Sequence, residues 1–142
     1  MRVPLAVLAD YANVTADGKL NIMGIFNQIN AAAVPVVHPQ MQLVFVMESD
    51  PQERGQTKQM EVHLLDPDGK TLLRIGAPVQ IPEDAPLTAR FNQMIQLNLV
   101  RFERYGDHSF RISVGGQEQQ AIAFQVNQVA PPQPLAALPP PA

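Results

Sequence analysis

The segments KQMEVHL at residues 58–64 and SFRISV at residues 109–114 alternate polar and apolar side chains without interruption. A period of two residues is that of a β-strand with one face against a core and the other in water. The segment QAIAFQV at residues 120–126 repeats the pattern. Gly115 and Gly116 precede it and permit the positive φ angles of a tight hairpin. These segments predict neighbouring antiparallel strands.

Further strands are predicted on both sides of this region. The DPDG sequence at residues 66–69 and the DG pair at residues 17–18 are typical hairpin turns. The segment at residues 41–47 is apolar on both faces, which favours an interior strand over an edge strand. We expect one strand over residues 20–29, with Gly24 at a bulge or bend. We expect another over residues 87–102, with Ile95, Leu97 and Leu99 inward.

The strand pattern covers almost the whole chain of 142 residues, a length that suits one domain. The spacing of an amphipathic helix is not sustained for three turns in any window. The sequence therefore predicts an all-β antiparallel β-sandwich of about eight strands, of Greek-key or jelly-roll type, over residues 1–129.

The last segment, residues 130–142, differs in composition. Six of its last twelve residues are proline, and none is charged. Proline cannot donate to a sheet ladder, so we expect a Pro-rich disordered tail. Residues 131–134 match P-x-x-P without the flanking basic residue that such ligands usually carry, which favours a solvated tail or a linker.

Composition excludes several classes of function. The chain has no cysteine, which excludes disulfides, thiolate nucleophiles and cysteine-ligated metals. The net charge of −3 with mixed signs argues against a nucleic-acid surface. Residues 3–9 are apolar but too short for a clear signal peptide, and Pro4 and Asp10 favour a first strand instead. Without an apolar run of about 20 residues, we expect a cytoplasmic protein with no membrane partner.

The sequence lacks the common catalytic patterns. His38, His63 and His108 are far apart, and none has a second histidine at a metal-ligand spacing. The serines lie outside a nucleophile elbow, and the sequence contains no phosphate-binding glycine loop. We therefore expect no enzyme activity and no cofactor.

Two kinds of polar residue remain as ligand candidates. Asp66, Asp68 and Asp107 are loop carboxylates that could contribute to a calcium site, although Asp-Pro-Asp-Gly is also ordinary turn chemistry. The chain has 15 Gln and 7 Asn but only 3 Lys, and several of these amides fall in the strands near residues 21–30 and 92–98. Such amides could bind sugar hydroxyls or simply be solvated. The scarcity of aromatic residues counts against a sugar site.

Several short motifs resemble those of a family of small bacterial proteins of unknown function. These motifs are ADYAN at residues 9–13, DGKLNIMGIF at 17–26, PVVHP at 35–39, GQTK at 55–58 and GDHSF at 106–110. The likeness covers about residues 5–127. It implies a compact bacterial β-sandwich, and it implies no catalytic residue because the family has no assigned activity.

Together these observations favour a non-catalytic protein-interaction or structural module, with self-association as a special case. The binding surface would be a sheet face, a loop end or an exposed edge strand. The alternative is a small-ligand module that binds carbohydrate or calcium through the loop of Asp66 and Asp68 and the amide-rich strands.

Overall fold

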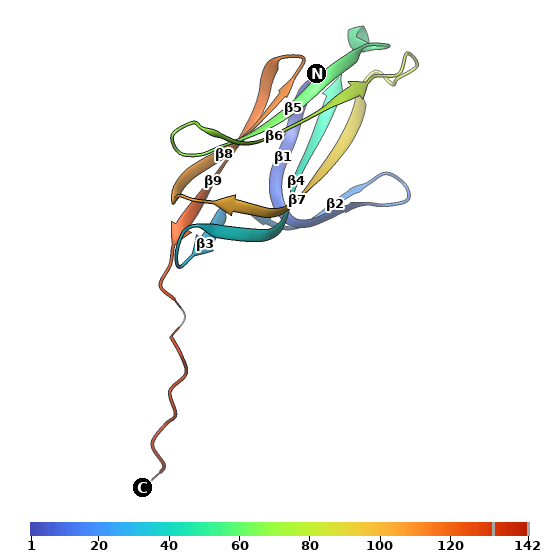
Figure 1. Cartoon of the computed structure of the whole chain (residues 1–142). Coiled ribbons are helices and arrows are strands. Elements are labelled where there is room, and N and C mark those ends of the chain that lie inside the picture. Colours follow the sequence, from blue (N-terminus) through green and yellow to red (C-terminus); the bar gives the residue numbers. More distant parts are fainter. Residues whose placement is uncertain (132, 142) are drawn as a thin grey trace.

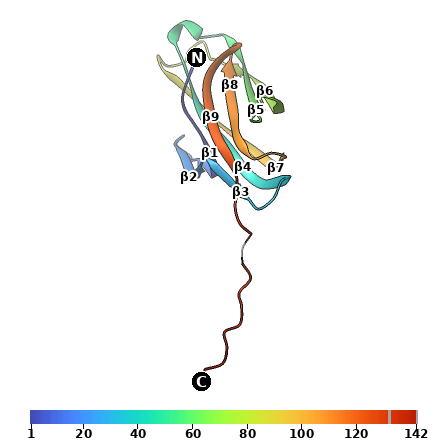
Figure 2. The same ribbon diagram turned by 90° about the vertical axis from the view of Figure 1, so that its left-hand side faces the viewer.

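A computed structural model of the chain describes residues 1–131 and 133–141, which form two β-sheets and an extended C-terminal segment (Figures 1 and 2). The strands are β1 (Arg2–Val14), β2 (Leu20–Phe26), β3 (Gln28–Ala31), β4 (Val36–Ser49), β5 (Thr57–Leu65), β6 (Thr71–Gln80), β7 (Ala89–Phe102), β8 (Gly106–Val114) and β9 (Gln117–Gln128). One sheet has the order β2-β1-β4-β7 and the other β3-β9-β8-β5-β6. A single 3-10 turn, Pro51–Glu53, follows β4. The predicted all-β class is confirmed.

The alternating segments form the strands expected of them. β5, β8 and β9 are neighbours, and Val114 pairs with Gln117 across a two-residue turn. Gly115 and Gly116 have φ angles of +62° and +80°, as a hairpin of this length requires. β4 lies between β1 and β7 as the interior strand that its apolar sequence predicts.

The prediction of one strand over residues 20–29 is wrong. The chain crosses from one sheet to the other at Asn27, whose carbonyl oxygen accepts a hydrogen bond from the Gln125 amide. The segment therefore divides into β2, which pairs with β1, and β3, which runs parallel to β9. This crossing raises the strand count to nine and makes the second sheet mixed instead of wholly antiparallel.

Gly24 lies at a close approach of two strands. The register between β1 and β2 is the same on both sides of Gly24, so the expected bulge is absent from this pair. Its φ angle is +72°, and a Cβ atom there would lie 2.6 Å from an Asp10 carboxylate oxygen. Glycine satisfies both constraints at this position.

The core lies between the sheets and is built around aromatic rings. Phe45, Phe102, Phe110 and Phe124 are fully buried. The rings of Phe110 and Phe124 stack with centroids 5.5 Å apart, and Phe102 meets Phe124 edge-on at 5.8 Å. Such pairs add packing energy beyond the area that they bury.

Leu99 does not lie inward as expected, and Val7 of the first predicted strand also faces outward. Val7 pairs with Val44 on the outer side of its sheet, away from the phenylalanines. Leu99 is 71% exposed because its φ angle of +54° turns the strand there, which ends the alternation that placed Leu97 inward. Positive φ is uncommon for a residue with a Cβ atom and is not visible in a hydropathy pattern.

The C-terminal segment follows β9 and leaves the domain (Figure 1). Its described residues, 130–131 and 133–141, form neither helix nor strand and are exposed. The described residues contain no helix that is long and apolar enough to cross a membrane.

Replacement of Phe110 by alanine tests the role of the aromatic core. Phe110→Ala removes a fully buried ring, and we expect the free energy of unfolding to fall by about 3–5 kcal/mol. Urea unfolding followed by circular dichroism measures this change. Gln125→Ala, at an exposed position, is the control and should stay within about 0.5 kcal/mol of the parent. A loss below about 1 kcal/mol for Phe110→Ala would contradict the importance of the ring.

Candidate functional site

The outer face of the five-stranded sheet carries paired charges. The Arg74 guanidinium lies 2.9 Å from Glu61, and the His63 Nε2 atom lies 3.3 Å from the other oxygen of the same carboxylate. Arg111 donates to both oxygens of Glu118 at 3.1 and 3.3 Å. The hydrogen bond from Arg74, followed by that from His63, holds the pKa of Glu61 below its ordinary value. The charges on this face therefore find partners within the face.

The outer face of the four-stranded sheet is different in kind. The cross-strand register places Val7 beside Val44 and Val44 beside Met94. It also places Ile25 beside Ala9 and Met23 beside Tyr11. Leu5 and its partner Val46 have the same phase in β1 and β4. The β1–β2 hairpin turns back over this end, where Leu20 and Ile22 line a pocket with Leu5 and Val46. The apolar face is defined by Leu5, Val7, Ala9, Tyr11, Met23, Ile25, Val44, Val46 and Met94.

Much of this surface is open to solvent. The large side chains at its margins are exposed, and Ile25 reaches 62%. The exposed members are Leu5, Tyr11, Met23, Ile25 and Met94. Contiguous exposed apolar patches on a sheet mark interaction surfaces more often than single exposed residues do.

Amides and charges lie at the borders of the apolar face. Gln42 pairs with Gln96, and the Gln96 amide donates to Asn98 at 3.2 Å. At the far end of β2, the Asn21 amide donates to Asn13 at 3.0 Å. Part of the amide-rich sequence therefore does line one sheet face. Asn27, Gln28 and Asn30 do not join it, because the chain has crossed to the other sheet by then.

Charges are confined to one end of the apolar face. Glu48 lies 2.8 Å from Arg90 and 3.3 Å from Arg2. The nine residues that define the face carry no formal charge. This surface can therefore be covered without removing ions from water, whose desolvation is costly.

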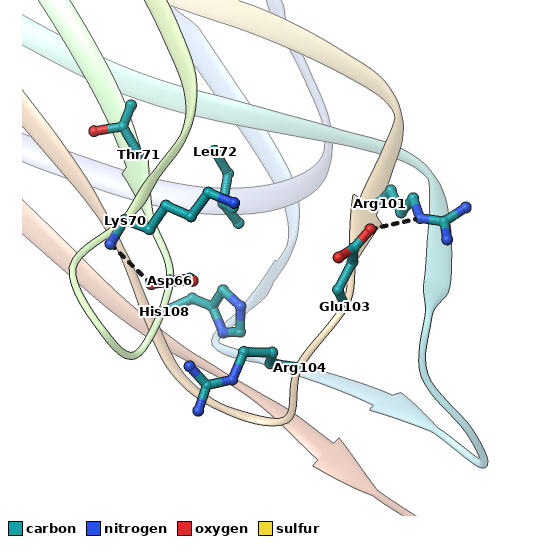
Figure 3. A pocket seen from close by; sticks show the side chains of 8 residues that line it. All are labelled: Asp66, Lys70, Thr71, Leu72, Arg101, Glu103, Arg104 and His108. Atoms are coloured by element: carbon teal, nitrogen blue, oxygen red, sulfur yellow. Dashed lines mark hydrogen bonds and ion pairs between the residues drawn. The ribbon is translucent and has the colours of Figure 1, made fainter.

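A pocket of about 360 Å³ lies where the β5–β6 hairpin meets the end of β7 (Figure 3). It is lined by Asp66, Lys70, Thr71, Leu72, Arg101, Glu103, Arg104 and His108. Most of its charges are already engaged: Arg101 lies 3.2 Å from Glu103, and Arg104 pairs with Asp68. One Asp66 oxygen accepts the amides of Asp68 and Lys70 at 2.9 and 2.8 Å. Asp66 thus caps its own turn.

His108 is the unusual member of this pocket. It is 2% exposed and lies against the rings of Phe102 and Phe124. Its Nδ1 atom lies 3.1 Å from the Gly106 carbonyl oxygen, which can only accept, so this nitrogen carries the proton in the neutral ring. Its Nε2 atom has no hydrogen-bond partner among the described residues. A buried acceptor without a partner is costly and calls for a donor.

The expected metal ligands are only partly brought together. Asp66 and Asp107 both line a second, smaller pocket beside His108, whereas Asp68 is paired with Arg104. In residues 1–131 and 133–141, no group of three or more carboxylates and histidines is placed to hold a metal ion. His63 does meet a carboxylate, but its partner Glu61 is two residues away on the same exposed sheet face.

Sequence reasoning missed both the pocket and the apolar face. Lys70, Arg101 and Arg104 come from separate elements, and their sequence spacing gives no indication that they meet. The apolar face had a weak signal. Met23 and Ile25 are large apolar residues in phase with Asn21, on the side of β2 opposite Leu20 and Ile22.

The paired charges on the five-stranded sheet predict the titration of Glu61. Its pKa is lowered, so the stabilisation from its ionised form is present above the unfolded-state pKa and is lost as pH falls through the folded pKa. Arg74→Met removes the main cause, and we expect the pKa of Glu61 to rise toward its ordinary value. NMR titration of the side-chain carboxyl carbon measures it. Arg101→Met is the matched control and should leave this titration unchanged; equal shifts in both variants would contradict the assignment.

Comparisons with known proteins bear on the family. One solved structure similar to the chain is an alkylpurine DNA glycosylase from Pseudomonas fluorescens, bound to DNA with an abasic-site analogue. Its TM-score is 0.46 at 14% identity, over 85% of this chain and 30% of that one. Another is an immunoglobulin-like protein from Pseudomonas aeruginosa, with a TM-score of 0.44 at 13% identity, over 89% of this chain and 95% of that one.

Sequence comparison is more informative. No curated protein matches the chain. The model of a family of unknown function, DUF6941, matches residues 4–127, which span all of β2 to β8 and nearly all of β1 and β9. The suspected kinship is confirmed: the chain belongs to this family of unknown function.

Proposed function

We propose that the domain is a non-catalytic protein-interaction module that self-associates through the apolar face of its four-stranded sheet. The observation that supports this proposal is that five large apolar side chains of β1, β2 and β7 in the four-stranded sheet are exposed, with Ile25 at 62%. The opposite outer face carries ion pairs instead. This difference between the two outer faces favours one specific binding face over nonspecific association.

A second copy of the chain suits this face as the partner. In a two-fold contact the same patch meets itself, so any charge at its centre would oppose a like charge. The defining residues of the apolar face have none. At the charged end, Glu48 lies between Arg2 and Arg90, which supplies both signs to a partner copy.

The flat part of the face is three strands wide. β2 pairs with β1 beyond the end of the β1–β4 ladder, and only Leu8 and Ala9 pair with both strands. The strands β1, β4 and β7, about 4.8 Å apart, and seven residues at about 3.4 Å each give roughly 14 by 24 Å, or about 340 Å². The smaller specific interfaces bury ~600 Å² per partner, so the exposed side chains of the β1–β2 hairpin would contribute the rest. Packing of one sheet on another at about 10 Å is the usual arrangement of such faces.

The absence of catalysis is part of the proposal, and the arrangement of titratable groups supports it. The histidine–carboxylate contact of His63 and Glu61 lies on an open sheet face, not in a cavity. An acid–base pair needs a site that holds substrate beside it. We also retain the expectations of a bacterial cytoplasmic location and a disordered tail.

A charge introduced into the apolar face tests self-association. Sedimentation velocity over a range of concentrations should show the full chain passing from monomer to dimer. We expect Ile25→Lys to weaken dimerisation at least tenfold, because the interface must then bury a charge. Gln125→Lys adds the same charge to the opposite outer face and should leave dimerisation unchanged. A monomer at every concentration up to the millimolar range would overturn the proposal.

A second candidate function is small-ligand binding in the pocket of Figure 3, and the unpaired Nε2 atom of His108 favours it. This nitrogen is covered, so a sugar hydroxyl would donate to it after a side chain at the pocket rim moves, and a carboxylate on the same ligand would meet Lys70. An acidic sugar combines both groups. Calcium fits less well, because Asp66 is occupied by its own turn and Asp68 by Arg104.

Thermal unfolding tests this candidate with glucuronate and galacturonate as probes and glucose as the neutral control. A probe at 100 times its Kd adds about 2.7 kcal/mol to stability. We expect an acidic sugar to raise the Tm of the parent and of Ile25→Lys, but not that of His108→Phe. Equal shifts in His108→Phe, or no shift with either probe, would dismiss the pocket.

A further inference from the structure

The two sheets leave one side of the sandwich open between their edge strands β6 and β7. A groove of about 350 Å³ lies along this side. Its apolar lining comes from Leu72, Leu73 and Ile75 on β6 and from Leu97, Leu99 and Val100 on β7. The groove is separate from the apolar face, which lies on the outer side of the four-stranded sheet.

Leu99 is the feature of this groove that most needs an explanation. It has a φ angle of +54° and is 71% exposed at the groove rim. A leucine in this conformation is strained, and in the isolated domain its side chain has little to contact. Both costs are offset if an apolar partner covers the rim.

The C-terminal segment carries apolar side chains with no contacts of their own. Leu135 and Leu138 are 102% and 90% exposed. Glu118 is the last residue in the sequence with a charged side chain, so the segment is uncharged. A proline-rich segment favours the polyproline II helix, which has three residues per turn and a rise of about 3.1 Å. Leu135 and Leu138 then project from one face, about 9 Å apart.

We propose that the groove between β6 and β7 binds the C-terminal segment of a second copy of this chain, with Leu135 and Leu138 as the anchors. Three residues along β6, from Leu72 to Ile75, span about 10 Å, which matches the separation of the two leucines. A cavity of about 150 Å³ holds a benzene molecule, so the groove volume is adequate for two leucine side chains.

The arrangement of the sheet favours a second copy over the segment of the same chain. The segment leaves from β9, which β8 and β5 separate from β6. Three strand spacings amount to about 14 Å, so the segment would reach its own groove only by turning back across the end of the sheet. Proline-rich chains are semi-rigid, and this one points away from the domain (Figure 1). It therefore presents its leucines to another molecule. The inference does not depend on dimerisation through the apolar face.

A labelled peptide of residues 130–141 with blocked ends tests the proposal directly by fluorescence anisotropy. The receptor is the full chain with Leu135→Asp and Leu138→Asp, which disable its own segment at exposed positions. We expect saturable binding that weakens at least fivefold when the receptor also carries Leu99→Asp. Aspartate tolerates positive φ, so this substitution should preserve folding. Leu87→Asp is the matched control, since Leu87 is also 71% exposed but lies outside the groove.

Each arm gives a decisive result. A peptide with both leucines changed to aspartate should fail to bind. This control changes only the peptide, so it does not depend on whether the receptor variants fold. Ile25→Lys in the receptor should not alter binding, which separates this site from the apolar face. The proposal is overturned if the parent peptide fails to bind, or if Leu99→Asp and Leu87→Asp have equal effects. It is also overturned if the chain with Ile25→Lys stays monomeric at millimolar concentration, because the segment would then occupy its own groove.

Discussion

The burial of β4 on both of its sides is the constraint on which the rest of the structure depends. Every residue from Met41 to Ser49 is buried. The inward side chains, with Phe45 at their centre, meet the five-stranded sheet and form the core. The outward ones include Val44 at 0% exposure and Val46 at 7%. The β1–β2 hairpin turns back over this side of the sheet: Leu20 and Ile22 line a pocket with Val46, and the Asn92 amide donates to the Gly18 carbonyl oxygen. Neighbours in the register, such as Val7 and Met94, are apolar as well, so the apolar face is a consequence of this strand.

The two outer faces present different kinds of side chain to solvent. The five-stranded sheet meets water with charges that pair within the sheet, as Glu61 does with Arg74. A second protein would have to desolvate those ions and would gain little from doing so. The four-stranded sheet meets water with aliphatic side chains and amides, whose burial is favourable or inexpensive when the amides remain paired. The proposed association through the latter face rests on this difference in hydration.

Local periodicity was sufficient to predict the strands, but not their assignment to sheets. The alternation in β5, β8 and β9 and the glycines between the last two are local signals, and the structure confirms them. The crossing at Asn27 is held by a hydrogen bond from Gln125, far along the chain, and the positive φ angle of Leu99 leaves no sign in a hydropathy pattern. For the same reason the capping role of Asp66 was predictable from its turn, whereas the pocket that includes Arg101 and His108 was not.

The two proposed contacts have different symmetry, and this difference determines what they can build together. A face that binds its own copy closes after two molecules. A segment that enters the groove of another molecule is a head-to-tail contact, which continues unless it closes into a ring. Since β7 separates the groove from the apolar face, one molecule can use both at once. A dimer formed through the apolar face would then carry two C-terminal segments and two grooves. Once one segment of the dimer is bound by a neighbouring dimer, the second segment is held close to its groove and binds more tightly. Two weak contacts of this kind are enough for a structural assembly, which a closed dimer alone would not provide.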